Sequence, residues 1–161
     1  MKTALFFAAF AIVGCTMVNA DDTIDVRGPP EDQFQPVALY LVHRCGSLDC
    51  HGEPGRNLRL YGQYGLRLDR GALTNGGPTT PDEIEADYRS VVALEPEIMT
   101  EVVHDHGKDP QQLTFYRKPR GLEHHKGGTL IKAGDPQDVC IRSWLASSTD
   151  VASCQAALDT P

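Results

Sequence analysis

Two cysteines and a histidine stand together in the segment RCGSLDCHGEPGRNLRLYG, residues 44–62: they are Cys45, Cys50 and His51. In c-type haem proteins, two cysteine thiols hold the haem through thioether bonds, and the histidine after the second cysteine binds iron. Such motifs usually have two residues between the cysteines, whereas this chain has four. Because the loop contains Gly46, it can bulge outward without moving the sulfurs apart. The residue types therefore permit covalent haem attachment.

Two other interpretations fit the same three residues. A Cys45–Cys50 disulfide would close a short loop and leave His51 solvated. A zinc site would use Cys45, Cys50, His51 and a distant histidine, which are suitable ligand types. On the motif alone, haem attachment and the disulfide are equally supported, and zinc ranks third.

A helix is predicted to deliver the motif. Apolar residues recur at helical spacing from Phe34 through Val37 and Leu41 to Cys45. Pro36 falls in the first turn, where its missing N–H costs nothing. We therefore expect this helix to end at Cys45.

The rest of the chain predicts an all-α domain with a glycine-rich loop insertion. Helices are expected after the capping residue Thr80, and from Pro96, Asp135 and Asp150. Residues 52–80 are rich in glycine and alternate in polarity, which favours short extended pieces or a wrapped loop. The expected fold is a small helical domain.

The N-terminal residues indicate export. Residues 1–20 combine Lys2, an apolar run and the small-residue sequence VNA, which is typical of a signal peptide. The segment IVGC at 12–15 also resembles a lipoprotein box, so cleavage before Cys15 would give a lipid anchor. We expect a flexible lead-in over 21–33 and one domain over 34–161.

Charge and composition exclude several classes of function. The formal net charge is -7, and removing residues 1–20 takes away one positive charge, Lys2, to leave -8. An acidic chain without a basic patch is a poor nucleic-acid binder. No Ser/His/Asp triad, phosphate loop or paired-carboxylate signature is found, and the Asp and Glu residues are interpreted as solvated faces. We therefore do not expect an enzyme.

The two C-terminal cysteines predict a disulfide. Cys140 and Cys154 lie on the last two expected helices, and export places them where disulfides persist. A bridge between them would pin the last helix, at roughly 3 kcal/mol for a loop of this length. Two buried free thiols are the alternative.

Three further segments follow the motif in a specific order: GLRLDRGALTNGG at 65–77, RKPRGLEHHKGG at 117–128 and GDPQDVCIRSWLAS at 134–147. With the CHG of the motif, this order resembles the haem-binding cytochrome c-like domains of planctomycetes and myxobacteria, over about residues 34–157. The longer spacing between the cysteines departs from the pattern. The resemblance implies a cytochrome c-like helical fold with haem c attached at Cys45 and Cys50 and His51 as the proximal iron ligand.

An electron-transfer haem usually has a second axial ligand, Met or His. His125 lies where the resemblance places a histidine, and the two glycines after it let the backbone approach a flat porphyrin. Met99 is the second choice, although a methionine on the inner face of a helix is usually a core residue. The candidates considered are Met99, His104, His106, His124 and His125.

The sequence thus predicts an exported haem c protein, periplasmic or secreted, that acts as an electron carrier or redox partner. Its redox partner is not specified by the sequence, and membrane contact is expected only through a lipid anchor at Cys15. The alternative is a haem-free, disulfide-stapled exported domain with a binding or structural role.

Overall fold

The computed structural model describes residues 25–69 and 77–160, and this part of the chain is all-α, as predicted. The predicted signal peptide and Cys15 lie outside the described residues. In the described residues no helix is long and apolar enough to cross a membrane. The α-helices are α1 (Gln35–Cys45), α2 (Pro81–Val92), α3 (Pro96–His104), α4 (Thr114–Arg117), α5 (Pro136–Leu145) and α6 (Val151–Leu158), with short 3₁₀ turns η2 (Glu31–Gln33) and η4 (Pro110–Gln112).

Side-chain caps fix where several helices begin. Thr80 and Glu83 form a reciprocal capping box at the start of α2. Asp135 accepts from the backbone N–H of Asp138 at the start of α5, and Asp150 does the same for Ser153 at α6. These caps satisfy N–H groups that a helix cannot pair internally, which explains why the helices begin at these positions. The predicted starts of α2, α5 and α6 are confirmed.

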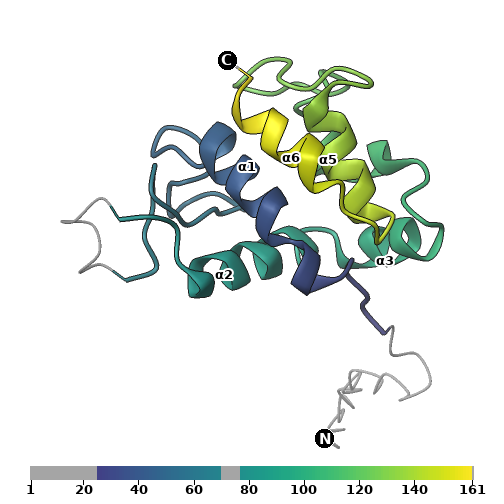
Figure 1. Cartoon of the computed structure of the whole chain (residues 1–161), viewed down its shortest axis with the longest axis horizontal. Helices are drawn as coiled ribbons and strands as arrows, with labels where there is room; N and C mark the ends of the chain where they lie inside the picture. The colour runs from purple at the N-terminus through teal and green to yellow at the C-terminus, as the bar shows by residue number, and fades with distance from the viewer. Residues whose placement is uncertain (1–24, 70–76, 161) are drawn as a thin grey trace, which may run out of the picture.

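The core forms where α1 lies against α5 and α6 on one side and α2 on the other (Figure 1). Trp144 is fully buried, with its ring centroid 4.7 Å from that of Phe34, and its indole N–H donates to the carbonyl of Pro30. The predicted Cys140–Cys154 disulfide is confirmed and joins α5 to α6. This framework fixes the direction of α1 and therefore the position of Cys45.

The glycine-rich segment wraps back onto the end of α1. A Cβ at Gly52 or Gly65 would lie 2.0 or 1.9 Å from the carbonyl oxygen of Gly46, so only glycine permits this backbone contact. No strand forms in the described part of the segment; Tyr61 and Leu66 make one isolated bridge. The expectation of a wrapped loop is confirmed for residues 52–69 and 77–80.

Three acidic residues are buried and bind to other segments of the chain. The prediction that the Asp and Glu residues form solvated faces is therefore wrong at these three positions. Glu83, Asp87 and Asp138 are at most 1% exposed. Glu83 pairs with buried Arg67, and Asp138 accepts hydrogen bonds from the Tyr116 hydroxyl and the Arg120 guanidinium. Buried carboxylates require such partners, which here come from distant segments.

Candidate functional site

The end of α1 positions both cysteines of the motif. The chain reverses after Cys45, and the N–H of His51 donates to the carbonyl of Cys45 at 2.8 Å. Within the loop, the N–H of Cys50 donates to the carbonyl of Ser47 at 2.9 Å. The thiols of Cys45 and Cys50 are half-buried and free, so the Cys45–Cys50 disulfide considered from the sequence is not formed.

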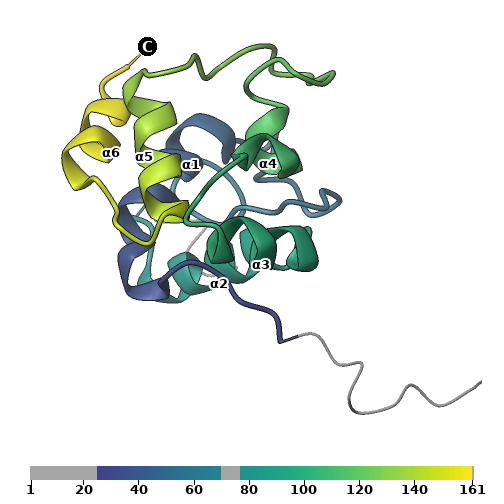
Figure 2. The same cartoon turned by 90° about the vertical axis from the view of Figure 1, so that its right-hand side faces the viewer.

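A cavity of about 540 Å³ opens beside this loop and is lined by Cys45, Cys50, His51 and His125. Cofactor sites typically measure about 300–1,000 Å³, so the cavity has the size of one. The loop after α1 and the segment after α4 lie on the same side of the fold (Figure 2). The apolar part of the lining includes Tyr40, Leu41, Leu58, Phe115, Ile131 and Ile141.

The two histidines come from segments far apart in the sequence and face a common space. The ring centroids of His51 and His125 lie 6.3 Å apart, and the ring planes differ by 19°. Each Nδ1 is hydrogen-bonded to a backbone carbonyl, that of Leu58 at 2.9 Å for His51 and that of Gly128 at 3.0 Å for His125.

These two hydrogen bonds determine the tautomer of each ring. A carbonyl oxygen only accepts, so each Nδ1 carries the proton, and the Nε2 of both rings is left with its lone pair. A histidine whose Nδ1–H donates to a carbonyl is the usual arrangement of a metal ligand that binds through Nε2. The Nε2 of each ring is therefore free to act as a nitrogen ligand.

The two glycines after His125 have different roles. A Cβ at Gly127 would lie 3.0 Å from Cε1 of the His125 ring, so the missing side chain gives the ring room. Gly128 has a φ of +72°, a left-handed conformation that glycine adopts without cost. That conformation presents the Gly128 carbonyl to the imidazole of His125. The glycines thus orient the histidine, whereas the sequence had suggested an approach of backbone to porphyrin.

Burial and charge set the protonation of the site. Burial is the main cause that lowers the pKa of His51, with smaller effects from His125, Arg56 and Lys118, so the imidazole is neutral at physiological pH. Burial also raises the pKa of the Cys45 thiol. Arg56, Lys118 and Lys126 line the cavity as cations, which makes its rim suited to a ligand that carries negative groups.

The structure places the other candidate iron ligands differently. Met99 is fully buried in the core on α3 and does not line the cavity. His104 and His106 are exposed at the end of α3, and His104 is paired with Asp105. His124 lines the cavity beside His125 and is exposed; within the described residues no hydrogen bond orients its ring as the Gly128 carbonyl orients that of His125.

A zinc cage is not assembled by the residues that the structure describes. Among residues 25–69 and 77–160, no three His, Cys, Asp or Glu side chains are grouped so that they could hold a metal ion. A structural zinc needs four such ligands. The donors at the cavity are the thiols of Cys45 and Cys50 and the imidazoles of His51, His124 and His125, which is a different arrangement.

Sequence reasoning missed most of the cavity wall. Leu58, Phe115 and Ile131 come from loops or a one-turn helix, where no helical periodicity marks an inward-facing residue. The cations Arg56 and Lys126 carried a detectable signal, because each lies a few residues from a predicted ligand. No protein-family model, curated protein or solved structure matches the chain.

Proposed function

We propose that the chain is an exported haem c protein, periplasmic or secreted, that carries single electrons to or from a redox partner. Cys45 and Cys50 hold the haem covalently through thioether bonds. His51 is the proximal iron ligand and His125 the distal one. The apolar walls of the cavity receive the porphyrin, which completes a core that is poor in aromatic residues.

One observation carries this proposal: the two cysteines and two histidines meet in a single cavity of about 540 Å³. The motif contributes three of these residues together, whereas His125 arrives from a separate loop. A simple disulfide loop would give no reason for a second oriented imidazole at the same cavity, and among the described residues no group of three His, Cys, Asp or Glu side chains forms a zinc cage.

The distance between the imidazoles supports ligation of one metal by both. Two metal–nitrogen bonds of about 2.0–2.1 Å account for about 4 Å. With each Nε2 directed at the metal, the rest of the 6.3 Å between the ring centroids would equal the two distances from Nε2 to its own ring centre. Iron in a porphyrin takes only two protein ligands, so two imidazoles suffice.

Haem supplies reversible one-electron chemistry when it is bound. The residues of the chain restrict that chemistry. His51 and His125 would both hold the iron, which would leave no place for oxygen or substrate to bind it and would favour electron transfer. The apolar side chains of Leu58, Phe115 and Ile131 keep water away from the cavity wall. With less water nearby, less solvent has to reorient when the charge of the bound group changes by one electron.

Covalent attachment is the first test. Protein produced with a haem-attachment system should be red, and the colour should survive denaturation and acid-acetone extraction. Cys45→Ser and Cys50→Ser should each weaken the attachment, whereas Cys154→Ser should not. A folded, colourless protein with a Cys45–Cys50 disulfide would refute the proposal and favour the haem-free exported domain.

The distal ligand is tested by spectroscopy of three variants. We expect a low-spin haem without the near-infrared band of methionine–sulfur ligation. His125→Ala should convert it to high spin or open it to added ligands, and the adjacent control His124→Ala should leave it low-spin. If Met99→Ala abolished the low-spin form and His125→Ala did not, Met99 would be the ligand.

A further inference from the structure

The lengthened loop between the cysteines makes one contact across the cavity. Lys126 Nζ donates to the carbonyl oxygen of Asp49 at 3.2 Å, over 77 residues of sequence. Asp49 lies in the four-residue loop that distinguishes this chain from the usual motif, and Lys126 directly follows His125. The contact therefore joins the loop of the attachment cysteines to the loop of the distal histidine.

The distal loop has few other attachments. Residues 121–129 are exposed except for half-buried His125. Their other bonds are to near neighbours in the sequence: His125 and Gly128 bond to each other, the N–H groups of Gly121 and Leu122 donate to the carbonyls of Lys118 and Arg117, and Glu123 pairs with Arg117 and Lys118. Within the described residues, no other hydrogen bond or ion pair joins residues 122–129 to residues 45–58.

The acceptor is itself held in place. Arg56 Nε donates to the carbonyl of Cys50 at 3.1 Å, and Arg56 Nη2 reaches the carbonyl of Asp49 at 3.5 Å. The backbone of Gly52 packs closely against the carbonyl of Gly46, which also restrains the loop. Lys126 thus donates to a carbonyl whose position other contacts restrain. The charge-assisted hydrogen bond to this carbonyl restrains the loop that carries Lys126.

From this geometry we propose that Lys126 is a positioning residue for His125. It fastens the distal loop to the loop between Cys45 and Cys50 and keeps the iron's sixth position closed to external ligands. The inference rests on the proposed function. It gives the longer cysteine spacing a role, because the added residues present the carbonyl that Lys126 binds.

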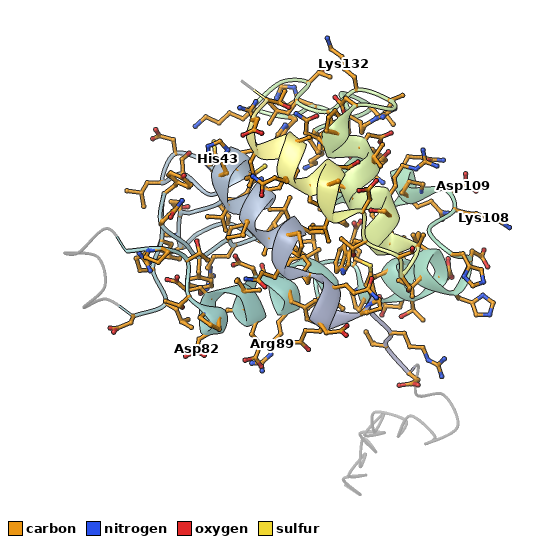
Figure 3. The ribbon with its side chains drawn as sticks, in the orientation of Figure 1. His43, Asp82, Arg89, Lys108, Asp109 and Lys132 are labelled. Atoms are coloured by element: carbon orange, nitrogen blue, oxygen red, sulfur yellow. A yellow bond between two sulfur atoms is a disulfide. The ribbon has the colours of Figure 1, made fainter. Side chains whose placement is uncertain are left out.

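The test compares the rate of cyanide binding to the ferric holoprotein in the wild type and in three variants. Lys126→Met should bind cyanide faster than the wild type by roughly fivefold to tenfold, the loss expected for one charge-assisted hydrogen bond at a partly exposed site. Lys126→Arg should restore most of the slow rate, because it keeps the charge and a donor. Lys132→Met is the matched control: Lys132 is exposed and projects away from the fold (Figure 3), and we expect no change.

The outcomes separate this inference from the proposed function. If the wild type holds a low-spin covalent haem and Lys126→Met binds cyanide at the wild-type rate, the inference is overturned and the function stands. If the wild type takes up no covalent haem, or is already high-spin, both are overturned. Should Lys126→Met not accumulate as folded protein, Lys126→Gln, with a shorter donor, gives the same comparison.

Discussion

Arg67→Met should lower the free energy of unfolding by about 3–5 kcal/mol, because it leaves a buried carboxylate without its cation. Arg67 donates to Glu83 twice, from Nε to Oε1 at 2.7 Å and from Nη2 to Oε2 at 3.1 Å. The two side chains are 4% and 2% exposed. The same guanidinium donates to the carbonyls of Gly77 and Pro78, so its removal also leaves these acceptors without a partner.

The pH dependence of this loss follows from the pKa of Glu83. Burial acts to raise that pKa, but the hydrogen bonds from Arg67, Thr80 and Leu68 hold it below its usual value. A lowered folded-state pKa stabilises the fold above the pH at which free glutamate titrates, about 4.3. In Arg67→Met, burial dominates and the pKa rises instead. The deficit of the variant should therefore be largest at neutral pH and shrink as the pH falls below about 5.

Urea denaturation followed by circular dichroism measures the effect. Arg89→Met is the matched control, because Arg89 is 72% exposed in its ion pair with Glu85 on α2 and should contribute less than about 1 kcal/mol. The double variant Arg67→Met/Glu83→Gln should regain part of the loss. If Arg67→Met cost no more than Arg89→Met, the interpretation of the pair as a buried clamp would be refuted.

Three other perturbations have defined outcomes. Cys154→Ser should lower the free energy of unfolding by roughly 3 kcal/mol, since it opens the Cys140–Cys154 bridge, while the haem spectrum is retained; denaturation and absorption spectra check this. Gly128→Ala should loosen the turn that orients His125 by about 1–2 kcal/mol, whereas Gly128→Asn should be better tolerated, as measured by the low-spin fraction on heating. Burial raises the pKa of Asp87 to about 8, so stability should decline as the pH rises from about 4 to 8; in Asp87→Asn this decline should disappear from urea titrations.

Local signals explain why the helices were predictable. Thr80, Asp135 and Asp150 cap their helices through residues three positions away, and a proline or an apolar repeat follows within the same turn. The disulfide was also predictable, since predicted export and an even number of cysteines after residue 20 leave few pairings. The caps act within one turn of the chain, and the two bridged cysteines are only 14 residues apart.

The geometry of the site depends on interactions that residue types do not reveal. His51 and His125 could be selected as candidates from their neighbours in the sequence. Their orientation depends on the carbonyls of Leu58 and Gly128, which are directed by turns. No side-chain pattern encodes which carbonyl will meet an imidazole.

The buried acids were unpredictable for a related reason. Glu83 and Asp138 sit on helices among other charged residues, where solvent exposure is the usual outcome. Their partners Arg67 and Arg120 lie 16 and 18 residues away in loops without periodicity. Only the folded chain brings each pair together.

The direction of α1 has a practical consequence for electrochemistry. The chain enters α1 at Gln35, and the helix ends at Cys45, so its eleven residues separate the entry point from the cavity by about 16 Å. The C-terminal end lies near the cavity end of α1, where the Arg44 guanidinium donates to the carbonyl of Thr160 (Figure 1). An electrode linker attached ahead of residue 25 should therefore leave the cavity on the side away from the electrode, and a linker placed after Thr160 should bring the cavity closer to the electrode surface, which would shorten the tunnelling path to the proposed haem.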